Sequence, residues 1–126
     1  MTKYLTAEQV IAFHDILLEE FGGLSGIRDK NLLHSALDAP KASFGGKEMY
    51  PTIYEKAAAY LYHIARNHPF NDGNKRTAYV AALAFLNANH APIKFQISNL
   101  EQIVVDVANG KLDKEKLAHF FKNGIL

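Results

Sequence analysis

The sequence contains no cysteine. Disulfide bonds, thiolate metal sites and cysteine-based catalysis are therefore excluded, and the absence suits a reducing compartment. An excess of charge is also missing, since the formal net charge is +1. Direct binding to nucleic acid is not expected, because such binding depends on many basic side chains neutralising phosphates.

Long hydrophobic runs are absent as well. The longest nearly apolar run, residues 77–86, would span about 15 Å as a helix, which is half of what a bilayer core requires. The first six residues lack the apolar segment of a secretory signal. We therefore expect a soluble, cytoplasmic protein that does not attach to a membrane.

The 126 residues, 48% of them apolar and 21% charged, suit one globular domain spanning residues 1–126. Helical periodicity and capping residues predict helices throughout. Thr6 with Gln9, and Ser98 with Glu101, have the spacing of capping boxes. The expected helices lie between Thr6 and Gly22, from Asp29 to Leu37, from Pro51 to about Asn67, from about Asn74 to about Asn89, between Ser98 and Gly110, and between Asp113 and Gly124.

Two segments depart from the pattern of amphipathic helices. Residues 78–86 leave almost no polar face, which is typical of a buried central helix. Residues 43–50 have no helical period and contain Gly45-Gly46, a turn signal that favours a small hairpin or flap. The expected fold is all-α, a helical bundle around a buried central helix with a small β-hairpin flap.

The segment from His68 to Thr77 carries the functional signal. It places a histidine and a carboxylate in a loop that leads into the first turn of the apolar helix. The free N–H groups of a first turn form an anion site, and Gly73 allows close approach of a ligand. Lys75 and Arg76 would oppose the helix dipole unless an anion lies between them. A polyphosphate suits this arrangement better than a single carboxylate.

The remaining groups of this loop complete the prediction. Asp72 has the wrong sign for phosphate unless a metal lies between, and Mg²⁺ is commonly held by one carboxylate plus phosphate oxygens. His68 is left as the base, because a histidine of ordinary pKa is mostly neutral at pH 7. Phe70 is expected to face the core and support the loop. The residues alone thus predict Mg-nucleotide chemistry on a hydroxyl.

This segment resembles the signature of the Fic/Doc (Fido) family: His-Pro-Phe, one variable residue, Asp or Glu, Gly-Asn, Gly or Lys, Arg. His68 through Arg76 match every fixed position. Lys75 stands where Fic proteins have glycine, as in the Doc (death-on-curing) subgroup. The resemblance extends over about residues 3–122, including Gly26-Ile27-Arg28-Asp29 and the Phe44-Gly45-Gly46 flap.

The resemblance implies a toxin of a toxin–antitoxin pair that phosphorylates a threonine of elongation factor Tu and blocks translation. Carried over by position, His68 is the base, Asp72 the Mg²⁺ ligand, and Gly73, Asn74, Lys75 and Arg76 bind the phosphates of ATP. The flap, represented by Phe44, Gly45, Gly46, Lys47 and Met49, would pair with the target chain and direct its hydroxyl towards His68. No inhibitory Ser/Thr-x-x-x-Glu-Gly/Asn helix is present, so a small antitoxin with a disordered C-terminal segment is expected as partner.

Alternative functions stay open at this stage. The same scaffold could transfer AMP or another NMP, because a single lysine is all that favours a reversed nucleotide. A partner-binding scaffold without activity is a second alternative, which the intact signature disfavours. Structural roles are expected for three other residues: His14 as a satisfied core histidine, and Arg28 and Asp29 as a turn and a helix cap. No zinc-binding pattern occurs.

Overall fold

The structure, a computed structural model, describes residues 1–126. Its elements in chain order are α1 (Ala7–Phe21), α2 (Lys30–Asp38), the 3₁₀ turn η1 (Ala39–Lys41), β1 (Ser43–Phe44), β2 (Lys47–Glu48), α3 (Ile53–Asn67), α4 (Asn74–Ala88), the 3₁₀ turn η2 (Ile97–Asn99), α5 (Leu100–Ala108) and α6 (Lys114–Asn123). The expected all-α fold with one small hairpin is confirmed. None of these helices combines the length and hydrophobicity that a membrane crossing requires.

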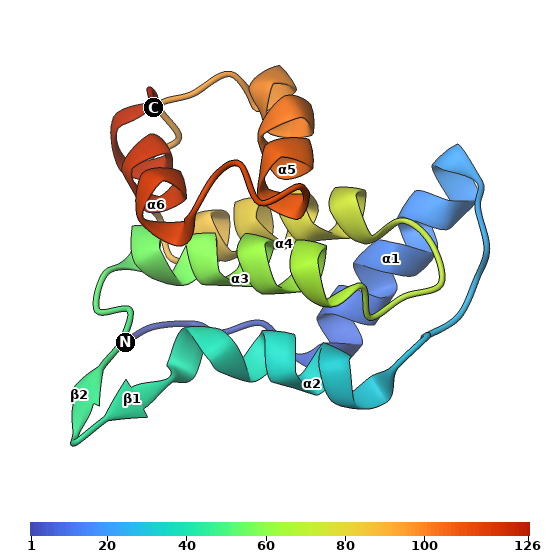
Figure 1. The fold of residues 1–126 in the computed structure, drawn as a ribbon, viewed down its shortest axis with the longest axis horizontal. Helices are drawn as coiled ribbons and strands as arrows, with labels where there is room; N and C mark the ends of the chain where they lie inside the picture. The colour runs from blue at the N-terminus through green and yellow to red at the C-terminus, as the bar shows by residue number, and fades with distance from the viewer.

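Helices α3 and α4 pack side by side through the middle of the molecule (Figure 1). Helix α2 packs on α3 from one side, α5 and α6 pack on it from another, and α1 packs against α4. The most buried helix is α3, with eight buried residues against six in α4. Helix α4 was the expected central helix; it is shielded by α1, α3 and α5, but Val80, Leu83 and Ala84 stay partly exposed.

The helix starts follow local capping chemistry. Thr6 and Gln9 form the expected capping box of α1, and Asp29 caps α2 through the N–H of Leu32 at 3.0 Å. Helix α3 begins two residues later than Pro51, because Thr52 and Glu55 form a capping box there that was not predicted. Capping boxes satisfy N–H groups that the first turn leaves unpaired.

The capping box expected at Ser98 and Glu101 is wrong. Ser98 lies inside the 3₁₀ turn η2, and α5 begins without a side-chain cap. A capping residue needs an extended backbone, whereas the chain is already helical at Asn99, with φ −71° and ψ −19°. The Glu101 side chain is thereby left free of a capping role.

The expected hairpin is confirmed as two paired residues on each strand. Ser43 pairs with Glu48 and Phe44 with Lys47 in antiparallel register. Gly45 and Gly46 occupy the two-residue turn with φ values of 57° and 80°. Both values are positive, as the tightest hairpin turns require, so glycine is the natural residue at each position.

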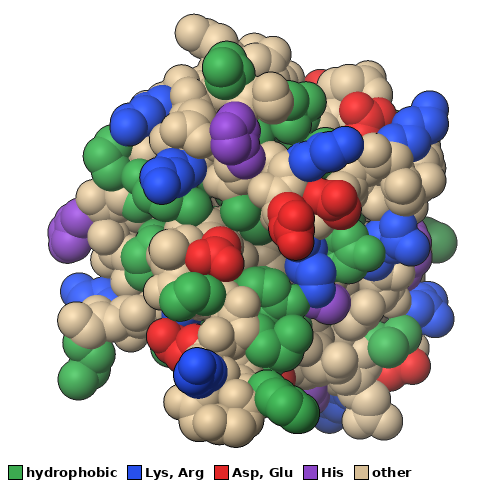
Figure 2. Space-filling model, turned by 60° about the vertical axis from the view of Figure 1, so that its left-hand side comes forward, with side chains coloured by type: hydrophobic (Ala, Val, Ile, Leu, Met, Phe, Trp, Pro, Cys, Tyr) green, Lys and Arg blue, Asp and Glu red, His purple; other side chains and the backbone are tan.

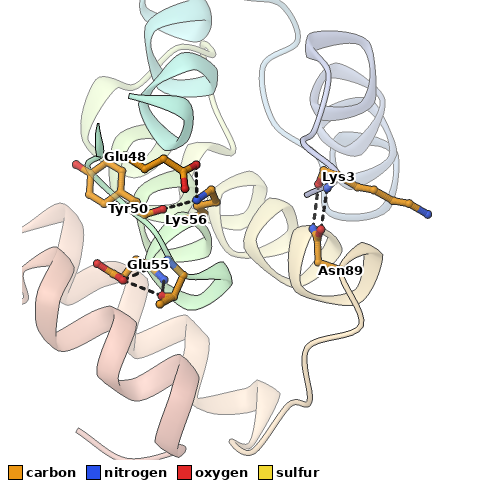
Figure 3. A network of polar contacts seen from close by, with 7 residues as sticks. Lys3, Glu48, Tyr50, Glu55, Lys56 and Asn89 are labelled. Carbon is orange, nitrogen blue, oxygen red and sulfur yellow. Dashed lines mark hydrogen bonds and ion pairs between the residues drawn. The ribbon is translucent and has the colours of Figure 1, made fainter. Parts of the chain in front are cut away.

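A buried lysine fixes the hairpin to the bundle. Lys56 on α3 is 1% exposed, and its Nζ lies 3.1 Å from the Glu48 carboxylate and donates to the carbonyl of Tyr50 (Figure 3).

The N-terminal segment is held by Asn89, which makes two hydrogen bonds with the backbone of Lys3, of 2.7 and 2.9 Å (Figure 3). Figure 2 is turned towards the hairpin side and shows charges of both signs distributed among apolar side chains.

Candidate active site

A cavity of about 480 Å³ lies where the loop after α3 meets the first turn of α4 and the side of α5. Its size falls within the usual range for sites that bind small molecules. Seven of its eleven lining residues belong to the segment His68–Arg76. The lining consists of His68, Asn71, Asp72, Gly73, Asn74, Lys75, Arg76, Tyr79, Glu101, Val104 and Val105.

His68 ends α3 and lines the cavity with an exposed side chain. Its backbone is left-handed, with φ 50° and ψ 55°, a conformation uncommon for any residue but glycine. Arg28 contacts this turn directly: its Nε donates to the carbonyl of His68 at 2.7 Å and its Nη2 to that of Asn67 at 2.9 Å. The imidazole therefore projects from a turn held by a side chain forty residues away.

The loop is anchored below by Phe70. Phe70 is buried, as expected for a supporting residue, and its ring stacks on the imidazole of His14. The side-chain amide of Asn74 makes two hydrogen bonds with the backbone of Phe70: it accepts from the N–H at 2.9 Å and donates to the carbonyl at 3.0 Å. The Asn74 side chain is thus committed to holding the loop, and only its backbone N–H is left for a phosphate.

Asp72 is oriented from three sides. Its carboxylate accepts from the N–H of Gly73 at 2.9 Å and from that of Leu24 at 3.2 Å. Its carbonyl accepts from Nε2 of His14 at 2.7 Å, which fixes the proton of that buried histidine on Nε2. The expectation that His14 is a satisfied core histidine is confirmed.

The α4 N-terminus faces the cavity without a capping side chain. Gly73 precedes the helix in a left-handed conformation with φ 75°, so the first-turn N–H groups keep their capacity to bind an anion. Lys75 and Arg76 line the cavity beside them, and neither forms an ion pair. The guanidinium of Arg76 lies 4.1 Å above the ring of Phe21, which fixes its direction by a cation–π contact.

The connection between α1 and α2 forms the other support of the site. Its residues 24–29 run beside residues 67–72: the N–H groups of Arg28 and Asp29 both donate to the carbonyl of Pro69, at 2.7 and 3.1 Å. Asn71 completes the contact, since its N–H donates to Gly26 and its side-chain amide to Ser25. The close approach depends on glycine, because a Cβ on Gly23 would lie 2.9 Å from a carboxylate oxygen of Asp72.

The hairpin is not brought to this cavity. None of Phe44, Gly45, Gly46, Lys47 and Met49 lines it. The hairpin precedes α3, whereas His68 follows it, and Figure 1 shows the hairpin and the loop that leads from α3 to α4 at opposite ends of α3. The fifteen helical residues of α3, about 22 Å in length, lie between them.

Four cavity residues were not predicted from the sequence. Tyr79 lies one turn beyond Lys75 on α4, so helical spacing could have revealed it. Glu101, Val104 and Val105 come from α5, and no local pattern connects that helix to the loop. The three α5 residues add apolar and acidic side chains to a cavity whose cations come from the start of α4.

The donor set of the site decides which kind of divalent cation site it can form. No group of three or more histidines and carboxylates that could hold a metal occurs in the structure. Asp72 therefore supplies a single carboxylate, whose two oxygens retain free lone pairs beyond their one backbone contact each. This fits Mg²⁺ shared with substrate phosphates and does not fit a closed protein-only cage.

The fold and this site together define a member of the Fic/DOC family, to which the chain belongs: the family model matches residues 4–86. The chain is 39% identical to a protein named Toxin Doc from Mycolicibacterium smegmatis over 120 residues, covering 94% of this chain and 90% of that protein. It is 33% identical to Protein kinase doc of Escherichia phage P1 over 116 residues, covering 92% of this chain and 90% of the phage protein.

Proposed function

We propose that this protein is a Doc-type toxin that transfers the γ-phosphate of ATP to a Ser or Thr hydroxyl of a protein. The observation that carries the proposal is the cavity, where a loop histidine, the loop carboxylate of Asp72 and an uncapped helix start with two unpaired cations meet. The names of the two relatives support a toxin with kinase activity.

The reaction assigns one task to each group. The imidazole of His68 accepts the proton of the target hydroxyl, whose oxygen forms a bond to the γ-phosphorus while the bond to the β–γ bridging oxygen breaks and ADP leaves. Lys75, Arg76 and the first-turn N–H groups of α4 hold the phosphate charge. General-base assistance of this kind is typically worth about 10²–10⁴ in rate.

Asp72 would hold Mg²⁺ together with the phosphates. The bound ion would neutralise charge on the transferring group. The role of this chain is to keep the carboxylate in place, through Gly73, Leu24 and the contact of His14 with the Asp72 carbonyl.

AMP transfer is the second candidate, because the same anion site accepts an α-phosphate in a reversed nucleotide. The side chain of Lys75 occupies space and adds charge on the cavity wall, where Fic proteins have glycine. This favours the kinase orientation. An inactive scaffold is disfavoured, since His68 and Asp72 are both present and face one cavity.

The target and the partner are proposed from the family resemblance. We propose elongation factor Tu as the target, with arrest of translation as the result, in the cytoplasm. A small antitoxin with a disordered C-terminal segment would restrain the toxin. Segments of this kind fold on binding, laying an apolar helix face into a groove.

The test uses a bacterial lysate with Mg²⁺ and ATP labelled at either the α- or the γ-phosphate, and compares wild type with His68→Ala. A protein band labelled only from the γ-position, and absent with the variant, is expected; its mass should be that of elongation factor Tu. Labelling from the α-position would establish AMP transfer instead. A band that His68→Ala labels at the wild-type rate would contradict the role of His68 as base.

A further inference from the structure

The backbone of His68 adopts a left-handed conformation that is uncommon for residues other than glycine, although histidine adopts it more often than most. Only two non-glycine residues of the chain have positive φ, His68 at 50° and His90 at 57°. Helices often end on a left-handed residue, but glycine usually occupies it. A general base cannot be glycine, so glycine is not available at position 68, and contacts from elsewhere can stabilise the conformation there. Strained backbone of this kind is characteristic of functional sites.

The contacts come from Arg28, on the connection between α1 and α2. Its Nε and Nη2 donate to two successive carbonyls, those of His68 at 2.7 Å and Asn67 at 2.9 Å. The planar guanidinium fixes the angle between its donors, so bonding both carbonyls constrains the peptide planes on either side of the His68 Cα. Its charge also lies at the C-terminal end of α3, where a cation is favoured.

The same connection also fixes Pro69, the residue after His68. The backbone N–H groups of Arg28 and Asp29 donate to the carbonyl of Pro69. Ile27 forms an isolated bridge with Phe70. The backbone of Arg28 is therefore hydrogen-bonded to the loop at Pro69. Its side chain bonds the carbonyls of the two preceding residues, His68 and Asn67. By contrast, the N–H of His90 donates to the backbone carbonyl of Asn87 at 3.1 Å, and no side chain bonds the backbone of His90.

We propose that Arg28 is a positioning residue of the phosphotransfer reaction. The two hydrogen bonds from its guanidinium to the carbonyls of Asn67 and His68 maintain the left-handed turn that directs the His68 imidazole into the cavity. This inference rests on the proposed function. Arg28 does not line the cavity, so its side chain is not placed to contact a bound nucleotide there. Its removal should therefore lower the rate of transfer while leaving nucleotide affinity in place, because the phosphate-binding groups lie on α4.

The kinetic test compares wild type with Arg28→Ala, Arg28→Lys and Arg66→Ala at fixed lysate concentration, with γ-labelled ATP. Arg66 is the matched control, since it also donates to a helix carbonyl, that of Val107 at 3.3 Å, but outside the loop. We expect Arg28→Ala to lower apparent kcat about 10- to 100-fold with KM for ATP changed less than about twofold, because small misplacements of a catalytic group can cost about 10²-fold. Arg28→Lys should recover part of the loss, and Arg66→Ala should keep kcat within about twofold.

A second readout does not depend on activity. Histidine labelled with ¹³C reports backbone conformation through its Cα and Cβ shifts, with His90 as an internal reference in the same sample. Arg28→Ala should move the His68 shifts away from left-handed values and leave those of His90 unchanged. Unfolding temperatures of both alanine variants show whether a loss of kcat only follows a loss of stability.

The outcomes separate the two proposals. If Arg28→Ala keeps wild-type kcat, or loses it only in proportion to stability as Arg66→Ala does, the inference is overturned. If wild type transfers no phosphate, the proposed function fails, and the His68 shifts alone decide whether Arg28 maintains the turn. Unchanged His68 shifts in Arg28→Ala overturn the inference in either case.

Discussion

The imidazole of His14 lies parallel to the ring of Phe70, with centroids 3.9 Å apart and 8° between the planes. The same imidazole donates from Nε2 to the carbonyl of Asp72. One buried side chain of α1 thus holds the loop at two places, the apolar anchor and the carboxylate that faces the cavity. The position of Asp72 therefore depends on a helix that the catalytic signature does not include.

Replacing His14 should lower the stability of the protein. His14→Ala removes the stacked ring and leaves the Asp72 carbonyl unpaired, so the free energy of unfolding should fall by about 2–4 kcal/mol. His14→Gln can retain a donor without the ring and should lose less. Urea unfolding measures the loss of stability in each of the two variants. His34→Ala, at an exposed histidine on α2, is the control and should change stability by less than about 0.5 kcal/mol; an equal loss in both alanine variants would refute the assigned contacts.

Gly23 should not tolerate a side chain. A Cβ there would lie 2.9 Å from Asp72 Oδ2 and 3.1 Å from Leu18 Cδ2, at φ 122°. Gly23→Ala should therefore cost about 1–3 kcal/mol and displace the carboxylate. Gly22→Ala is the matched control, because Gly22 also has positive φ, 80°, but a methyl group there would meet no atom within 4 Å. Chemical unfolding and γ-phosphate transfer should both distinguish the two variants, with activity lost only in Gly23→Ala.

Lys75→Gly tests what determines the transferred phosphate. Removing this side chain from the cavity wall should shift labelling towards the α-phosphate or lower the rate of γ-transfer. Lys116→Gly, in the exposed first turn of α6, controls for the helix cost of glycine, about 1 kcal/mol. Transfer from α- and γ-labelled ATP is measured in parallel. Unchanged rate and product would make Lys75 incidental to the reaction.

His63 should make stability fall as the pH is lowered. Burial, with the nearby Lys114 charge as a second cause, lowers the pKa of His63 from 6.5 to about 4. The unfolded chain then binds a proton between these values that the folded chain does not. The contribution of neutral His63 to the free energy of unfolding is fully present above pH 6.5 and is lost as the pH falls towards 4. The expected loss between pH 7 and pH 5 is on the order of 1 kcal/mol, allowing for partial exposure.

The measurement is urea unfolding at pH 7, 6 and 5, comparing wild type with His63→Gln. Carboxylates contribute equally to both proteins, so their difference isolates the histidine. The free-energy difference between the two should change with pH in favour of His63→Gln at the acidic end. A difference that stays constant over this range would contradict the lowered pKa.

The parts of the structure predicted correctly are those set by neighbouring residues. The Thr6 cap, the Asp29 cap, the Gly45-Gly46 turn and the loop leading into α4 each depend on a few consecutive side chains. Ser98 shows the limit of this reasoning, because a preceding 3₁₀ turn removed the extended backbone that its capping role required.

The parts that were missed depend on contacts between distant residues. Arg28 was predicted as a turn residue, and its grip on His68 joins positions forty residues apart. Glu101 reaches the cavity only because α5 packs on α4. The side-chain amide of Asn74 closes the loop on the backbone of Phe70, four residues earlier, a contact that the sequence did not indicate. Local patterns do not encode such pairings.

Helix α3 acts as a spacer of fixed length between the hairpin and His68. A target that contacts both must cover about 22 Å, and an extended chain advances about 3.3 Å per residue. A peptide shorter than about seven residues therefore cannot reach the hairpin while presenting its hydroxyl at the cavity. Lys56 contacts Glu48 and Tyr50 and so holds the base of the hairpin at the first turn of α3. Only a substrate that makes an extended contact along α3 can therefore use both places at once.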